Sequence, residues 1–157
     1  VVPRVHIVKY GAYMQADVEG SPDTEVDILA RIEQGLAERD SADPTSCKLH
    51  GFVLEGASPY GFGTEGQVAA LTVAAYTGMP VVKVGRADPG GRVPSNANDA
   101  FIEGSNLDAN KARLLLIAAM MKLGRLPRAA DPRSPTAEER AALLAKVEEY
   151  QEIFETH

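Results

Sequence analysis

The sequence has one cysteine, no tryptophan and no long hydrophobic run. Cys47 cannot form an internal disulfide, and it has no second cysteine with which to hold a metal. No apolar stretch approaches the roughly 20 residues of a membrane-spanning helix, so we expect no association with a membrane. Acidic residues outnumber basic ones by 22 to 16, for a net charge of −6. This balance argues against the basic face that nucleic-acid binding requires.

Length and composition are those of one ordinary globular domain. The 157 residues are 45% hydrophobic, which is enough to bury a core. No charged segment followed by an apolar one marks a signal peptide. The lone thiol is compatible with a reducing compartment, so we expect a cytoplasmic location. The chain begins at Val1 rather than Met, and we interpret residues 1–4 as a linker of an excised domain that leads into a sheet.

Short hydrophobic segments alternate with segments of helical periodicity along the chain. Strands are predicted at 5–10, 51–56 and 81–85, and helices at 24–39, 64–78, from 108 through the apolar run 114–121, and 136–154. Two helices begin with a capping box, Thr64 with Gln67 and Thr136 with Glu139. This alternation predicts an α/β fold with a small parallel, Rossmann-like sheet and flanking helices. We expect one domain over 1–126, with a linker and an amphipathic helix at 127–157 packed on it.

The carboxyl ends of parallel strands are where open α/β sheets bind their ligands. Polar residues that follow the predicted strands should therefore gather along one edge. They include Glu55, Arg86 and Asp88, and the candidates for substrate binding are Ser58, Tyr60, Asn96 and Asn98.

The segment Gly61–Gly66 matches the pattern G-x-G-x-x-G between a predicted strand and a predicted helix. Such glycines can bring a pyrophosphate to the helix N-terminus, and Asp88 stands where a ribose-binding acid is expected. Glu65 would place a negative charge beside the phosphates, and four residues separate Gly56 at the strand end from Gly61. We therefore favour an ordinary glycine-rich turn and keep nucleotide binding as an alternative.

Other catalytic patterns are missing. The three histidines, His6, His50 and His157, belong to no H-E-x-x-H or C-x-x-C arrangement, so we expect neither a metal nor another cofactor. The G-x-S-x-G pattern of serine hydrolases is also missing. The apolar run 114–121 is compatible with core packing, with a partner-binding surface, or with both in an oligomer.

Several segments occur in the order found in bacterial L-asparaginases and glutaminases. They are Pro3–Val8, Gly51–Gly56, Pro80–Arg86, and Gly104–Leu107 followed by Lys111–Leu116, of which the last pair is the most specific. Over roughly 3–126 the chain resembles the C-terminal domain of that family, and the terminal helix after it is also similar to the family's. One departure concerns the glycine loop, where Pro59 stands near a position at which the family usually has asparagine.

This resemblance implies a homodimeric or homotetrameric hydrolase that converts asparagine or a related side-chain amide into acid and ammonia. In the family, a threonine nucleophile and its proton-transfer groups lie in an N-terminal domain, which this chain lacks. The C-terminal domain helps to recognise the substrate in a neighbouring subunit. We therefore expect a chain that is inactive alone and acts with its own N-terminal domain. The alternatives are a free-standing small-molecule or nucleotide-binding module and a purely structural dimerisation domain.

Overall fold

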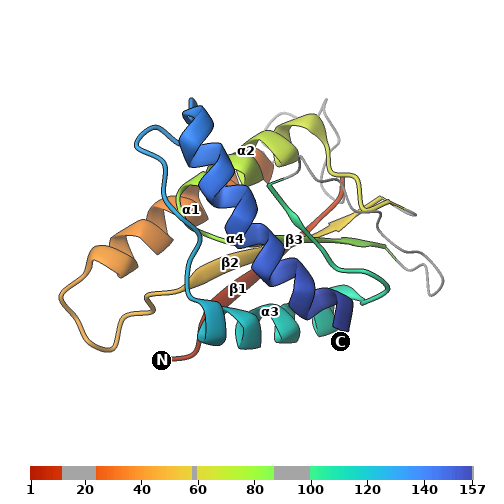
Figure 1. Ribbon diagram of the computed structural model, residues 1–157, viewed down its shortest axis with the longest axis horizontal. Coiled ribbons are helices and arrows are strands. Elements are labelled where there is room, and N and C mark those ends of the chain that lie inside the picture. Colours follow the sequence, from red (N-terminus) through yellow and green to blue (C-terminus); the bar gives the residue numbers. More distant parts are fainter. Residues whose placement is uncertain (12–23, 58–59, 87–99, 157) are drawn as a thin grey trace.

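Among the described residues, four parallel strands form the centre of the molecule in the order β1-β2-β3-β4 (Figure 1). The structure is a computed structural model that describes residues 1–11, 24–57, 60–86 and 100–156. The strands are β1 (Arg4–Lys9), β2 (His50–Gly56), β3 (Val81–Gly85) and β4 (Ile102–Glu103). The predicted α/β fold with a small parallel sheet and flanking helices is confirmed.

In the described part of the chain, four helices surround this sheet (Figure 1). They are α1 (Thr24–Asp40), α2 (Glu65–Tyr76), α3 (Ala109–Leu123) and α4 (Ala137–Thr156). Helices α1 and α2 pack on each other, α3 covers β1, β2 and β3, and α4 lies against β4 and α3. None of the helices in the described part of the chain combines the length and the hydropathy that crossing a bilayer requires.

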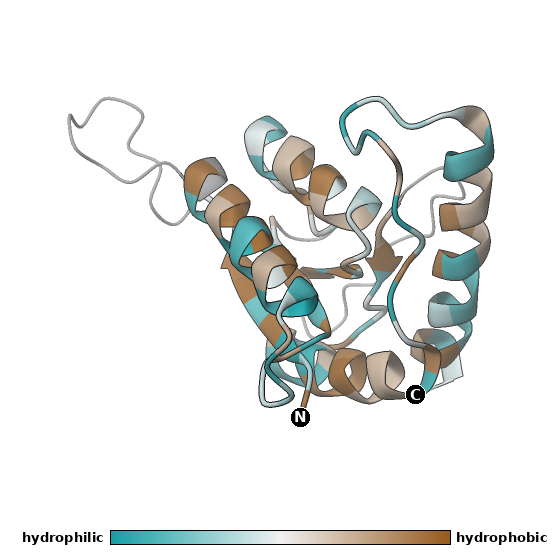
Figure 2. Cartoon of the chain, turned by 90° about the vertical axis from the view of Figure 1, so that its left-hand side faces the viewer, coloured by the Kyte–Doolittle hydropathy of each residue, from teal (hydrophilic) through white to brown (hydrophobic). Residues whose placement is uncertain are grey.

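The core lies between the sheet and the helices. The strands at the centre of the molecule are hydrophobic, whereas the helices around them carry both hydrophilic and hydrophobic residues (Figure 2). Val81, Val82 and Val84 of β3 are fully buried, as expected for a strand that is covered on both faces. Leu116 of α3 and Tyr150 of α4 fill the other side of the core without exposed surface.

The predicted capping boxes are present. At α2, Thr64 Oγ1 accepts from the N–H of Gln67 at 3.1 Å, and Gln67 Oε1 accepts from the N–H of Thr64 at 3.1 Å. At α4, Glu139 Oε2 accepts from the N–H of Thr136 at 2.8 Å, and Thr136 Oγ1 accepts in return at 3.2 Å. Each box satisfies N–H groups that a helix leaves unpaired in its first turn.

Strand β4 is the element that sequence reasoning missed. It has two residues and follows an irregular segment, so it is too short to show any periodicity. Its pairing is tertiary, because Ile102 and Glu103 align with Val82 and Lys83 of β3. Gly104 follows at once, and a Cβ atom there would lie 2.3 Å from Val84 Cγ1, so the chain can pass this close to β3 only with glycine.

Candidate functional site at the carboxyl edge of the sheet

A tight loop follows β2 at the carboxyl edge of the sheet. The N–H of Ala57 donates to the carbonyl of Phe62 at 2.7 Å, and the N–H of Gly61 donates to the carbonyl of Ala57 at 2.8 Å. Gly61 has φ of +69°, a left-handed conformation that favours glycine. A Cβ atom on Gly56 would lie 2.1 Å from the carbonyl carbon of Gly61. The two glycines therefore allow the loop to return onto the strand end.

This loop presents an exposed aromatic pair. Tyr60 and Phe62 are 48% and 62% exposed, and their rings meet edge to face with centroids 5.7 Å apart. Tyr10, just after β1, adds a third exposed ring at the same edge of the sheet. Exposed aromatic side chains that gather at a sheet edge are typical of a recognition surface.

Charged groups accompany these rings. Lys9 and Glu55 are register partners on β1 and β2, and their Nζ and Oε2 atoms lie 3.9 Å apart. Arg86 follows β3, where its N–H donates to the carbonyl of Gly56 at 3.0 Å and its side chain is exposed. An edge that carries both signs of charge suits a small dipolar ligand such as an amino acid.

Only one of the four predicted binding residues can be located. Tyr60 lies at the carboxyl edge, and its role in binding stays a prediction. Ser58, Asn96 and Asn98 lie outside the described residues, as do Asp88 and Pro59. Sequence reasoning missed Lys9 and Tyr10, although the rule that singled out Glu55 also applies to the end of the first strand.

The Gly61–Gly66 turn has the geometry of an internally capped helix start. The backbone N–H groups of Thr64 and Gln67 each donate to the side chain of the other residue, so these two donors are not free for a phosphate. Gln67 also donates from Nε2 to the carbonyl of Lys9 at 3.0 Å, which ties α2 to the end of β1. A Cβ atom on Gly63 would approach Leu54 Cδ2 to 3.0 Å, so this glycine makes room for the strand below it. The geometry favours the ordinary turn over a dinucleotide site.

A cavity of about 230 Å³ lies between β1 and α1. Its polar lining comes from His6, Lys9, Asp27 and Arg31. Arg31 donates from Nε to Asp27 Oδ2 at 2.9 Å and from Nη1 to His6 Nδ1 at 3.0 Å. Since a guanidinium group can only donate, Nδ1 of His6 carries no proton. Burial, and then the charge of Arg31, lowers the pKa of His6 to about 4.

Behind His6 lies a second histidine network. His50 is 5% exposed, its ring stacks beside that of His6, and its Nε2 lies 3.0 Å from Glu38 Oε2. Burial lowers the pKa of His50, although the negative charge of Glu38 opposes the shift. Burial alone would raise the pKa of Glu38, but hydrogen bonds from Gln34 and Arg4 outweigh it and lower that pKa. Glu38 therefore stays ionised and holds a neutral His50.

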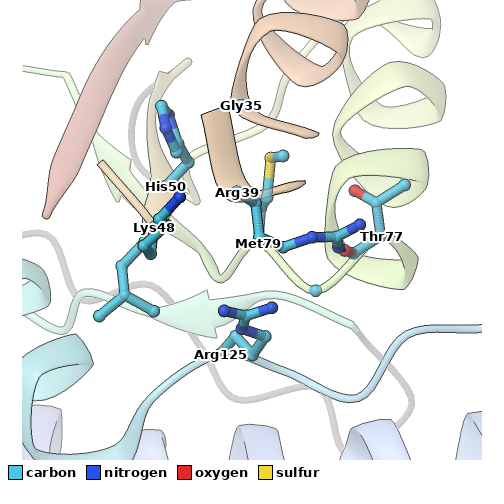
Figure 3. Close-up of a pocket in the computed structure, with 9 residues that line it drawn as sticks. Gly35, Arg39, Lys48, His50, Thr77, Met79 and Arg125 are labelled. Carbon is cyan, nitrogen blue, oxygen red and sulfur yellow. Dashed lines mark hydrogen bonds between the residues drawn. The ribbon is translucent and has the colours of Figure 1, made fainter. Parts of the chain in front are cut away.

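A basic crevice adjoins His50 at the opposite, amino-terminal edge of the sheet (Figure 3). Arg39 approaches it from α1 and Arg125 from the segment after α3. Lys48 donates from Nζ to the carbonyls of Glu38 and Ser41, at the end of α1. The free space is about 10 Å³, which is room for one water molecule and not for a phosphate or carboxylate ligand. Within the described ranges, no group of three or more possible metal-ligating side chains occurs.

Comparison with known proteins finds no matching family model and no matching curated sequence. A solved structure, the probable cytoplasmic L-asparaginase from Campylobacter jejuni, does match, with a TM-score of 0.56 and 21% sequence identity. The match covers 92% of this chain and 37% of the Campylobacter chain, so this chain spans about a third of that protein's length. At this identity the likeness concerns the fold. The α/β unit described here is therefore similar in fold to one part of an L-asparaginase, which confirms the resemblance expected from the order of its sequence segments.

Proposed function

We propose that this chain is the C-terminal domain of an L-asparaginase-like amidohydrolase and that its carboxyl edge helps to recognise an amide substrate. The observation that carries the proposal is the fold match over 92% of this chain but only 37% of the Campylobacter enzyme. The sequence supports the proposal separately, because the segments Gly104–Leu107 and Lys111–Leu116 resemble the C-terminal part of the family.

The chemistry of the carboxyl edge supports this role. The substrate, an amino acid with a side-chain amide, has an ammonium and a carboxylate group. Glu55 can attract the first and Lys9 or Arg86 the second, while Tyr60 offers a ring and a hydroxyl beside them. In the family, the nucleophile that attacks the amide belongs to the other domain. The isolated chain is therefore expected to lack activity, and the location expected for the complete protein is the cytoplasm.

The proposal is tested on the complete natural protein. Its intact mass and sequence should show a further domain, and it should release ammonia from asparagine or glutamine. The present chain alone should release none. A complete protein without a second domain, or robust ammonia release by this chain alone, would contradict the proposal.

The role of the edge is tested with three variants of the complete protein. Tyr60→Ala should raise KM for the amide about tenfold, which corresponds to the loss of one good aromatic contact. Tyr60→Phe separates the hydroxyl from the ring. Arg140→Ala, an exposed change on α4, is the control that should leave KM unchanged. An unchanged KM in Tyr60→Ala would remove Tyr60 from the site.

The cavity between β1 and α1 favours one second candidate, a small-molecule-binding module. Its volume of about 230 Å³ is sufficient for an amino-acid-sized ligand, and Arg31 could bind a carboxylate there. L-aspartate should then raise the melting temperature of the isolated chain, because a ligand of the native state stabilises it. Arg31→Met should abolish the shift while Arg140→Ala keeps it. An absence of any shift would exclude this function for aspartate.

A further inference from the structure

Gln67, in the first turn of α2, has a completely buried side chain whose amide group makes two hydrogen bonds. Its Oε1 accepts from the backbone N–H of Thr64 at 3.1 Å, and its Nε2 donates to the backbone carbonyl of Lys9 at 3.0 Å. A flipped amide would set a donor against an N–H group and an acceptor against a carbonyl, so the chemistry fixes this orientation. Both ends of the amide are therefore committed to the backbone.

The carbonyl of Lys9 lies on the free side of β1. Among the described residues, β1 pairs with a strand on one side only, where β2 lies. The N–H of Tyr10 donates to the carbonyl of Glu55 on β2 at 2.8 Å. Because consecutive residues of a strand direct their backbone groups to opposite sides, the carbonyl of Lys9 points away from β2. The hydrogen bond from Gln67 therefore holds the last residue of β1 on the side that the sheet leaves free.

This hydrogen bond joins the two halves of the proposed recognition edge. Lys9 and Tyr10 stand at the end of β1, whereas Tyr60 and Phe62 belong to the loop that leads into α2. Helix α2 packs on α1 and β3, and the bond from Gln67 ties its first turn to β1. The position of the Lys9 charge relative to the two rings of the loop thus depends on a side chain that is itself buried.

We propose that Gln67 is a positioning residue, which fixes the end of β1 against the loop before α2 and so sets the geometry of substrate recognition. It does not touch the substrate, because its side chain is fully buried and both ends of its amide are occupied. It acts through Lys9, whose Nζ lies 3.9 Å from Glu55 Oε2 and is available for the substrate carboxylate. The inference rests on the proposed function and adds to it a residue outside the exposed edge.

Two variants of the complete natural protein separate this tether from the helix cap. Gln67→Met keeps the length of the side chain and removes both hydrogen bonds of the amide. Thr64→Ala removes the other half of the capping box, in which Thr64 Oγ1 accepts from the N–H of Gln67, and leaves the tether in place. Both should weaken the start of α2. Only Gln67→Met should raise KM for the amide, by about fivefold with kcat unchanged, which is the effect of one hydrogen bond lost from binding.

Gln67→Glu supplies a rescue that depends on pH. A protonated carboxyl group has the shape of the amide, accepts from Thr64 and donates to Lys9, whereas the ionised group sets an oxygen against the carbonyl of Lys9. Burial raises the pKa of such a group, so its KM relative to the natural protein should be close to one at about pH 5.5 and about fivefold or more at about pH 8. KM of Gln67→Met should stay high at both pH values.

Hydrogen exchange of the complete protein measures the tether without relying on activity. The N–H of Tyr10 should exchange about fivefold faster in Gln67→Met than in Thr64→Ala, because the end of β1 is released. The N–H of Phe52, which donates to the carbonyl of Pro80 between two inner strands, should exchange equally in both. Circular dichroism verifies folding, and if Gln67→Met is unfolded, Gln67→Glu at the two pH values carries the test.

The outcomes separate this inference from the function on which it rests. Ammonia release by the natural protein with an unchanged KM in Gln67→Met would overturn the positioning role alone. An equal rise of KM in Thr64→Ala, no pH-dependent rescue in Gln67→Glu, or equal exchange of Tyr10 in the first two variants would overturn it as well. A natural protein that hydrolyses neither asparagine nor glutamine would refute the proposed function, and the role of Gln67 in substrate recognition would fall with it.

Discussion

His6 should make the stability of this protein depend on pH between about 4 and 6.5. Its Nδ1 accepts a hydrogen bond from Arg31, and burial together with that cation lowers its pKa from 6.5 to about 4. Protonation would set an N–H group against the guanidinium group at a distance of 3.0 Å. The unfolded chain therefore binds a proton at a higher pH than the folded one. Stability is lost as pH falls through this window.

The size of the effect follows from the two pKa values. At pH 5 a shift from 6.5 to about 4 corresponds to a loss of about 2 kcal/mol relative to neutral pH. Solvent screening at the partly exposed ring reduces this, so we expect a loss of between about 1 and 2 kcal/mol from His6. His50 adds a change of the same sign, since burial lowers its pKa as well.

Urea denaturation at pH 5 and pH 7.5, followed by circular dichroism, measures this difference. His6→Asn keeps an acceptor for Arg31 and does not titrate, so it should remove about 1–2 kcal/mol of the pH dependence whatever its overall stability. Ile32→Val is the control, because it should cost about 0.5–1.5 kcal/mol at both pH values and leave their difference unchanged. An equal pH dependence in His6→Asn and the natural protein would refute the argument.

Four further substitutions test the packing, each measured by urea denaturation at pH 7.5. Gly56→Ala should destabilise by about 3 kcal/mol or more, since its Cβ would lie 2.1 Å from the backbone of Gly61; a near-neutral result would show that the loop can move away. Leu116→Ala should cost about 2–5 kcal/mol because the side chain is fully buried, whereas Leu114→Ala should stay within about 0.5 kcal/mol because Leu114 is exposed; equal costs would contradict the assigned faces of α3. Tyr150→Phe should cost about 1–3 kcal/mol, because the buried hydroxyl of Tyr150 donates to the carbonyl of Gly124, which follows α3. An unchanged stability would mean that this hydrogen bond is not formed in solution.

The sequence predicted most of the secondary structure because those signals are local. Thr64 with Gln67 and Thr136 with Glu139 fix helix starts within four residues of chain, and the valines of β3 mark a strand covered on both faces. Strand β4 was missed because its two residues become a strand only by pairing with β3. The boundary predicted between 126 and 127 stays a prediction.

The sequence predicted where the candidate site lies, but it predicted only some of the residues that form it. The rule that ligands bind at the carboxyl edge of a parallel sheet singled out Glu55, Tyr60 and Arg86. It was not applied to Lys9 and Tyr10, although the same rule covers them. Phe62 is exposed only because the loop turns back at Gly61, a geometry that no local pattern in the sequence announces.

By itself, the sequence determined all the helices and three of the four strands in the described residues, and the order of those segments indicated an asparaginase-like fold. The reason is that periodicity, caps and turn residues act over a few positions. Tertiary structure alone decided which face of α3 is buried and which histidine accepts a hydrogen bond from Arg31. Whether a side chain is buried, and which group it hydrogen-bonds, depends on elements that are distant in the chain. Only the packed sheet brings those elements together.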